Sequence, residues 1–244
     1  MRALTVDGLV NARDLGGLPL TGGGTTPHGV FFRAENIDAV TDRGWDELHS
    51  LGIRTVVDLR QEAERARDRR RRPDWLVTTH VDLDGLENVD FWRDFADNGL
   101  WGTALYFLPH LAAMPERAGA ALSAIADAGD GGVLFHCMSG RDRTGLVAML
   151  LLSVIGAEPD AIVDDYLETV RNADALARAT GRENDEPVRD VILARHGSTT
   201  ELAFRDALAG LDVDTFLGAA GLSESTVRRL RTWRGSVVAG ERPR

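Results

Sequence analysis

The stretch Val133-Leu-Phe-His-Cys-Met-Ser-Gly-Arg-Asp-Arg-Thr-Gly145 decides the fold that we expect for this chain. Its first residues are apolar and predict a strand over 132–136, and the apolar run that follows it predicts a helix over 144–155. Cys137 and Arg143 lie in the short connection between the two. A strand that enters a helix through a loop with glycine is typical of anion-binding sites, because loop N–H groups and the helix N-terminus converge there.

The rest of the chain alternates between short apolar runs and longer amphipathic segments. We expect strands over 30–33, 53–59 and 76–83, and helices over 109–127 and 160–178. A further helix is expected from a Thr41 cap to Gly52, Asp160 is the expected cap of the helix over 160–178, and 61–72 is a polar helix or loop that Pro73 ends. This order predicts an α/β fold with a mostly parallel central sheet flanked by helices.

We expect one domain over 1–244, with a core over about 9–182 and a helical extension over 183–244 packed on it. In open parallel sheets ligands bind at the carboxyl ends of the strands, which is where Cys137 is placed.

The loop after Cys137 has the chemistry needed to hold a phosphate dianion over a thiolate. Arg143 supplies a planar, permanently charged fork for two phosphate oxygens. A helix N-terminus and nearby cations favour the thiolate form of a cysteine, so Cys137 is the expected nucleophile and a phosphocysteine the expected intermediate. The residues expected to bind the phosphate are Met138, Ser139, Gly140, Arg141, Asp142 and Arg143.

Two neighbours of this loop have supporting roles in the same hypothesis. His136 is expected to orient the backbone of Cys137, and Thr144 to donate a hydrogen bond to the sulfur when it becomes the leaving group. The alternative is a buried structural cysteine, which would not need the Gly-Arg-Asp-Arg-Thr-Gly run beside it.

The loop at 136–145 resembles that of atypical bacterial protein-tyrosine phosphatases, which also act on phosphoinositides and have a His-Cys-x-x-Gly-Lys-Asp-Arg-Thr-Gly loop; tensin-type lipid phosphatases have a related one. The segments at 11–17, 32–34 and 51–60 fall in the order of that family, so the resemblance covers about 9–182. It implies a protein-tyrosine-phosphatase-like fold. Where the family has lysine, this chain has Arg141. The chain has no lysine, so all 28 of its basic residues are arginine, and a coding bias explains the replacement.

Departure of an alkoxide or phenoxide needs a general acid, and two aspartates are candidates. Asp84, just before Gly85, lies on a loop after an expected strand, where related phosphatases place this acid; an ordinary turn is the alternative. Asp82 is expected still within the strand. Asp142 is the rival, because the resembling family has an aspartate at that position that is implicated in catalysis.

Further residues have open alternatives. Asp14 either bonds the phosphate loop, braces an arginine or caps a turn, and Arg60 either faces the same crevice or pairs with a carboxylate. The arginine run at 65–72 is either a patch for anionic lipid headgroups or acidic phosphopeptides, or a solvated helix end. The aromatic residues at 91–107 form either a mobile lid or part of the core.

Composition excludes several classes of protein. A net charge of −10 argues against general nucleic-acid binding. One cysteine excludes an internal disulfide framework and a zinc site built from two thiolates. The longest apolar run is too short to span a bilayer and the N-terminus is no secretory signal, so we expect a cytoplasmic protein without membrane insertion.

The sequence therefore predicts a metal-independent, cofactor-independent protein-tyrosine phosphatase acting on phosphoproteins. The alternatives are a phosphoinositide or dual phosphatase, a phosphate-binding pseudophosphatase, and, more remotely, sulfur transfer on a rhodanese-like loop.

Overall fold

The structure, a computed structural model, describes residues 2–68 and 70–236 and contains a five-stranded sheet. The strand order is β1-β2-β5-β3-β4; β1 pairs antiparallel with β2, and all other neighbours are parallel. The strands are β1 (Arg13–Asp14), β2 (Phe31–Ala34), β3 (Ile53–Asp58), β4 (Val77–His80) and β5 (Gly132–His136). The predicted α/β fold with a mostly parallel sheet is confirmed.

Successive side chains of the strands enter two separate apolar cores, as strand geometry requires. Val57 and Phe135 point to the larger core, whereas Val56 and Leu134 point to the smaller one. Helix α1 (Asp42–Ser50) covers the smaller core with Trp45. Its predicted cap is confirmed, because Thr41 Oγ1 accepts the N–H of Gly44 at 3.2 Å. Both faces of β5 are buried, so the residue after it is held at the centre of the sheet.

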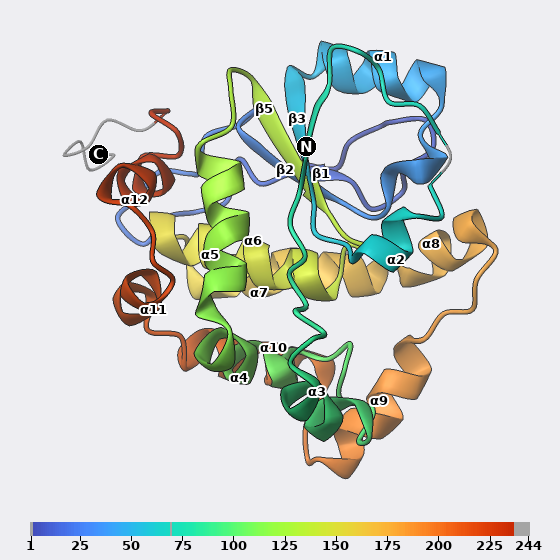
Figure 1. Ribbon diagram of the computed structural model, residues 1–244, viewed down its shortest axis with the longest axis vertical. Helices are drawn as coiled ribbons and strands as arrows, with labels where there is room; N and C mark the ends of the chain where they lie inside the picture. The colour runs from blue at the N-terminus through green and yellow to red at the C-terminus, as the bar shows by residue number, and fades with distance from the viewer. Residues whose placement is uncertain (1, 69, 237–244) are drawn as a thin grey trace.

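Helices α5 (Pro115–Ala126) and α6 (Asp142–Ile155) cover the larger core and lie on the opposite side of the sheet from α1 (Figure 1). The other helical elements run in chain order. They are η1 (Ile37–Ala39), α2 (Glu62–Arg65), α3 (Val89–Ala96), η2 (Ala104–Tyr106), α4 (Phe107–Ala113), α7 (Pro159–Arg171), α8 (Ala173–Thr180), α9 (Glu186–Arg195), α10 (Thr200–Ala209), α11 (Val213–Ala219) and α12 (Glu224–Arg231).

Two helices were predicted too long because their breaks were missed. Pro115 divides the helix expected over 109–127 into α4 and α5, since proline lacks an N–H and keeps the preceding Met114 out of the helical region. The helix expected over 160–178 is divided at Asn172, and it starts at Pro159 with Glu158 as cap in place of Asp160. The strand expected over 76–83 is β4, which ends at His80, so Asp82 lies beyond it.

The C-terminal helices pack on the core, as Figure 1 shows for α11 and α12 beside α5. Phe204, Phe216 and Leu230 belong to the larger core, and Trp233 packs edge-on against Phe31 of β2 with ring centroids 4.5 Å apart. In another part of the molecule, α3 lies beside α9 (Figure 1), and a Cβ on Gly99, just after α3, would lie 3.0 Å from Ile192 of α9. The division into a core over 9–182 and an extension over 183–244 stays a prediction, with 237–244 outside the described residues.

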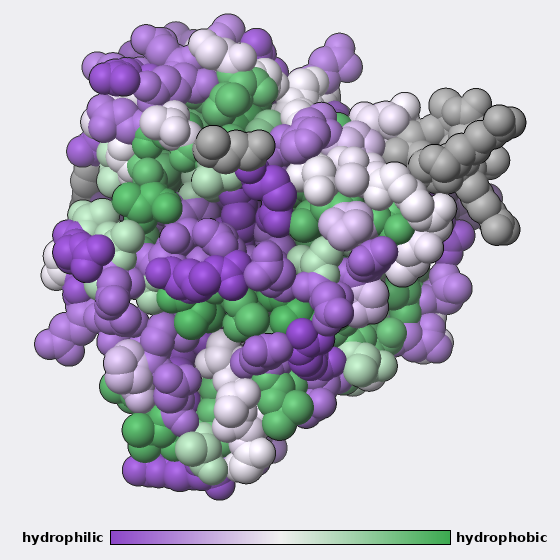
Figure 2. Space-filling model, turned by 180° about the vertical axis from the view of Figure 1, so that it is seen from behind, coloured by the Kyte–Doolittle hydropathy of each residue, from purple (hydrophilic) through white to green (hydrophobic). Residues whose placement is uncertain are grey.

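The aromatic stretch at 91–107 belongs in part to the core. Trp92, Tyr106 and Phe107 are buried in the larger core, so for these three the expectation of core packing holds and that of a lid does not. Trp101 is exposed. On the face seen in Figure 2, hydrophobic side chains show in separate groups between hydrophilic ones. No helix among the described residues is long and apolar enough to cross a bilayer.

Candidate active site

Cys137 follows directly on β5, at the carboxyl end of the central strands, and α6 begins five residues later at Asp142. Gly140 has a φ of +71°, and a Cβ there would lie 2.6 Å from Ala34 O, so this position requires glycine. Among the described residues, no side chain caps the N-terminus of helix α6. Its first N–H groups are therefore free to bind an anion.

Three carbonyls of the loop are held by donors from other segments. Met138 O accepts the N–H of Asn36 at 2.9 Å, Ser139 O accepts Asn11 Nδ2 at 3.2 Å, and Gly140 O accepts an Arg33 NH group at 2.6 Å. Within the described chain, the N–H groups of 138–141 donate to no protein acceptor. With its carbonyls tied back in this way, the loop presents unpaired N–H donors for an oxyanion.

A buried ion network supports Arg33. Asp165 of α7 accepts from Arg33 at 2.6 Å and from Arg13 at 3.0 Å, and Arg2 also pairs with it. Burial alone would raise the pKa of Asp165, but Arg13, Arg33 and Arg2 lower it well below the usual range. Since leaving one buried charge unpaired is costly, this network fixes the position of the loop. No pattern in the sequence indicates Asp165, because its partners lie more than a hundred residues away.

Arg143 extends from the first turn of α6 toward α2. Its two NH groups donate to the carboxylate of Glu64 at 2.5 and 2.8 Å, and one lies 3.1 Å from Asp84 Oδ2. Burial disfavours the charged form of Arg143, but the hydrogen bond to Glu64 and the charges of Asp84 and Glu64 outweigh this effect and raise the pKa of Arg143 well above its ordinary value. Glu64, which the sequence analysis did not single out, thus orients the predicted phosphate-binding fork.

The two predicted acids have different surroundings. Asp84 is buried and accepts from Gln61 Nε2 at 2.6 Å, and its backbone carbonyl accepts Trp92 Nε1 at 2.9 Å. Burial raises the pKa of Asp84, against the effect of Arg143. Asp142 is more accessible, with 17% of its side chain exposed, and accepts from Arg141 at 2.8 Å. Asp82 caps the turn at Gly85 through the N–H groups of Asp84 and Gly85.

The supporting residues flank the cysteine. His136 Nδ1 lies 3.0 Å from Cys137 O, while Nε2 is 3.8 Å from Asp58 and has no hydrogen-bond partner among the described residues. Burial lowers the pKa of His136 to about 4, so its ring is neutral at pH 7. Thr144 is buried, and its Oγ1 has no partner in the described chain.

Tyr106 is a buried residue next to Trp92 that no sequence pattern singled out. Its phenol is buried without a hydrogen-bond partner among the described residues. Burial raises its pKa, and the charges of Asp142 and Asp84 raise it further. The ring of Tyr106 packs against Trp92, with ring centroids 5.5 Å apart, and Trp92 Nε1 donates to the backbone carbonyl of Asp84. Only its place in an aromatic stretch set it apart in the sequence.

Arg141 does not contribute its guanidinium to the phosphate site in this structure. That group donates to Gly102 O at 2.6 Å and pairs with Glu186 at 2.7 Å, with Thr200 nearby at 3.5 Å. The guanidinium of Arg141 therefore binds residues of α9 and α10 in place of the phosphate. Only the backbone N–H of Arg141 is left to bind an anion in the loop. The ion pair with Glu186 holds the side chain of Arg141 away from the phosphate loop.

Asp14 and Arg60 likewise have structural partners. Asp14 accepts the N–H groups of Gly16 and Gly29 at 2.8 and 3.0 Å and contacts His28, so it caps a turn and does not bond the phosphate loop. Arg33 and Asn11 brace the loop in its place. Arg60 is buried and pairs with Asp58 and Asp38, each at 2.8 Å. Of the two alternatives for Arg60, pairing with a carboxylate is therefore the one observed.

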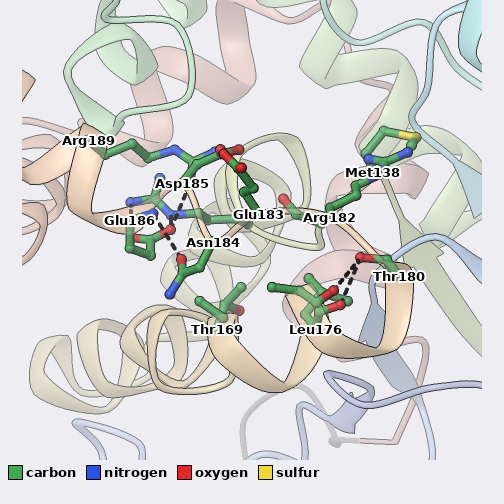
Figure 3. A pocket seen from close by; sticks show the side chains of 14 residues that line it. Met138, Thr169, Leu176, Thr180, Arg182, Glu183, Asn184, Asp185, Glu186 and Arg189 are labelled. Atoms are coloured by element: carbon green, nitrogen blue, oxygen red, sulfur yellow. Dashed lines mark hydrogen bonds and ion pairs between the residues drawn. The ribbon is translucent and has the colours of Figure 1, made fainter.

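A narrow groove of about 90 Å³ runs along the outer side of the loop. Met138 enters it from the phosphate loop, on the opposite side from Arg189 and Glu186 of α9 (Figure 3). The segment 180–185 forms the wall between α8 and α9. The C-terminal part of the chain thus borders the site directly.

Comparison with known proteins identifies the class. A model of the tyrosine phosphatase family matches residues 4–233. The chain is 32% identical over 248 residues to a Cupriavidus necator protein named as a tyrosine-protein phosphatase, covering 97% of this chain and 89% of the relative. It is 29% identical over 252 residues to the triple specificity protein phosphatase PtpB of Mycobacterium tuberculosis, covering 83% and 90%.

Among solved structures, TpbA of P. aeruginosa in complex with pTyr matches with a TM-score of 0.42 and 15% identity, over 91% of this chain and 97% of that one. The family match and the named relatives, by contrast, define the class: a phosphatase, which is a hydrolase of phosphate monoesters. The chain belongs to the tyrosine phosphatase family.

Proposed function

We propose that this protein is a cysteine-dependent protein-tyrosine phosphatase that works through a phosphocysteine intermediate. The phosphate dianion binds the N–H groups of 138–143 and the fork of Arg143. The Cys137 thiolate attacks phosphorus, the P–O bond to the phenol breaks, and the departing oxygen takes a proton from an acid. Water then attacks the thiophosphate, inorganic phosphate leaves, and Thr144 donates a hydrogen bond to the freed sulfur.

The observation that carries this proposal is that the N–H groups of 138–141, between Cys137 and Arg143, have no acceptor among the described residues. The carbonyls of the same loop are held by hydrogen bonds from other segments. Fixed donors aimed at the equatorial oxygens stabilise charge where it develops in the transition state. They and Arg143 supply the positive field, so the proposed reaction needs no metal or organic cofactor.

We assign different roles to the two acids. Asp142 lies in the first turn of α6 and is partly exposed, so it can reach the leaving oxygen on the solvent side of phosphorus. Asp84 is buried between Gln61 and Arg143 and is the positioning residue for that arginine.

Phosphotyrosine in proteins is the proposed substrate, and a phosphoinositide is the alternative that the same loop would accept. The name of PtpB describes three specificities for that relative. We further propose a cytoplasmic location, where a reactive thiolate stays reduced, and a single domain over 1–244.

The test compares phosphate release from a phosphotyrosine peptide and a phosphoinositide series for the wild type, Cys137→Ser and Arg143→Ala. We expect turnover of the peptide by the wild type only, with phosphate-ligand binding kept in Cys137→Ser and lost in Arg143→Ala. Preference for the lipids would replace the proposed substrate with the alternative. Full activity of Cys137→Ser would overturn the covalent mechanism, and binding without turnover in the wild type would indicate a pseudophosphatase.

A further inference from the structure

Helix α2 separates the phosphate loop from a second, polar cavity. Gln61 and Glu64 face the loop through Asp84 and Arg143. Glu62 and Arg65 of the same turn line a cavity of about 380 Å³ on the other side. A helix with its side chains is about 10 Å wide, so the two sites are neighbours separated by roughly that distance.

Four arginine side chains line this cavity. The lining consists of Asp58, Arg60, Glu62, Arg65, Ala66, Asp68, Arg70, Arg72, Thr78 and His80. Two of the four arginines are neutralised: Arg60 pairs with Asp58 and Asp38, and Arg72 pairs with Asp38 and Asp68. Because carboxylates balance the charges of Arg60 and Arg72, these two arginines are not the ones expected to bind an anionic ligand.

The other two arginines have no carboxylate partner within residues 2–68 and 70–236. Arg65 Nε is buried without any hydrogen-bond partner there, and the guanidinium of Arg70 donates to Val40 O at 3.1 Å, while its backbone N–H donates to Asp68. Burial lowers the pKa of His80, and the charge of Arg65 lowers it further, so His80 is a neutral hydrogen-bonding group at pH 7. The remaining carboxylate is Glu62, on the exposed side of α2. Two uncompensated guanidinium groups in one cavity favour a dianion, because charge-assisted bonds to phosphate are strong.

We propose that this cavity binds the second phosphate of a doubly phosphorylated peptide whose phosphotyrosine occupies the loop at 137–143. This inference rests on the proposed function and extends it by defining the substrate class. A peptide in extended form advances about 3.3 Å per residue, so a phosphate about three residues from the phosphotyrosine spans α2.

The surroundings favour a peptide over a lipid headgroup. The phosphates of one inositol ring are held closer together than the width of a helix, and the net charge of −10 opposes approach to an anionic membrane. Strand β4, which contributes Thr78 and His80, is the last strand in the sheet order. Its open edge offers an extended chain a path beside the cavity.

The experiment compares the hydrolysis of a phosphotyrosine peptide with that of the same peptide carrying phosphoserine two, three or four residues away. For the wild type we expect the best doubly phosphorylated peptide to have a KM about tenfold lower than the singly phosphorylated one, with a similar kcat. Arg65→Gln/Arg70→Gln should abolish this difference and leave hydrolysis of the singly phosphorylated peptide unchanged. Arg71→Gln is the matched control, because its side chain is 84% exposed, pairs with Asp74 and does not line the cavity.

Equal kcat/KM for all peptides with the wild type would overturn the proposal, as would the same loss in Arg71→Gln. If Arg65→Gln/Arg70→Gln impairs only the hydrolysis of a phosphatidylinositol bisphosphate presented in vesicles, the occupant is a lipid headgroup and the peptide assignment is wrong. If the wild type hydrolyses neither peptide, the proposed function fails. Calorimetric binding of the two peptides to Cys137→Ser, with and without the Arg65 and Arg70 changes, then tests the cavity by itself.

Discussion

Glu64 and Arg143 lie 79 positions apart in the chain and form a two-pronged ion pair, with N···O distances of 2.5 and 2.8 Å. Burial would raise the pKa of Glu64, but the hydrogen bond to Arg143 lowers it below its usual value. The pair fixes the direction of the guanidinium before any phosphate arrives. Preorganisation of this kind lowers the cost of reaching the transition state.

Glu64→Gln should therefore reduce kcat on a phosphotyrosine peptide by about tenfold without raising KM, because Arg143 loses its anchor while a negative charge near the phosphate is removed. Steady-state kinetics checks this. Glu62→Gln, two residues away on the exposed side of α2, is the control and should match the wild type on this peptide. An unchanged kcat in Glu64→Gln would mean that the pair does not position Arg143.

The sequence predicted the strand, loop and helix around Cys137 because that information is local: apolar periodicity, a required glycine and a fixed spacing. The expected strand over 132–136 and helix over 144–155 agree with β5 and α6 to within two residues. Glu64, Asp165 and Glu186 escaped prediction because each acts through a partner that is distant in sequence. Arg141 shows the same limit, since the sequence shows its charge but not the carboxylate that binds it.

The two aspartates should respond differently to the acidity of the leaving group. Asp142→Asn should lower kcat on phosphotyrosine by about 10²–10³-fold, and by less on an aryl phosphate with a more acidic phenol, which leaves without a proton. Asp84→Asn should lower activity on both substrates to the same extent, because Asp84 positions Arg143. Rates measured over a series of aryl phosphates distinguish the two. Equal losses on all leaving groups in Asp142→Asn would assign the acid elsewhere.

Glu186 joins the phosphate loop to the C-terminal part of the chain through Arg141. Glu186→Ala leaves a buried arginine without its main partner and should lower the free energy of unfolding by about 3 kcal/mol. Urea unfolding measures this, and Glu183→Ala, an exposed neighbour, should change it little. A loss no larger than that of the control would show that Asp142 and Gly102 suffice to hold Arg141.

Stability should depend on pH through His136. Its pKa is lowered by burial from 6.5 to about 4, so the unfolded chain takes up a proton first as the pH falls. The free energy of unfolding should therefore decrease between about pH 6.5 and pH 4, by up to about 1.4 kcal/mol per pH unit for this group. Burial lowers the pKa of His110 too, so it adds a change of the same sign.

Unfolding measured from pH 7 to pH 4 should thus show a shallower slope for His136→Asn than for the wild type. Carboxylates with lowered pKa values, such as Asp165, add a further decrease below about pH 5, but they do so in both proteins and leave the difference between the slopes unchanged. Parallel slopes for the two proteins would mean that the ring of His136 is not held neutral.

The most direct test of the central claim is to look for phosphate on Cys137 itself. The chain has a single cysteine, so mass spectrometry of acid-quenched, digested enzyme gives an unambiguous result. During turnover of a phosphotyrosine peptide, the fragment with Cys137 should carry one phosphoryl group in the wild type, accumulate more of it in Thr144→Ala, and carry none in Cys137→Ser. Phosphate release by the wild type with an unmodified Cys137 fragment at every quench time, together with an active Cys137→Ser, would contradict the account.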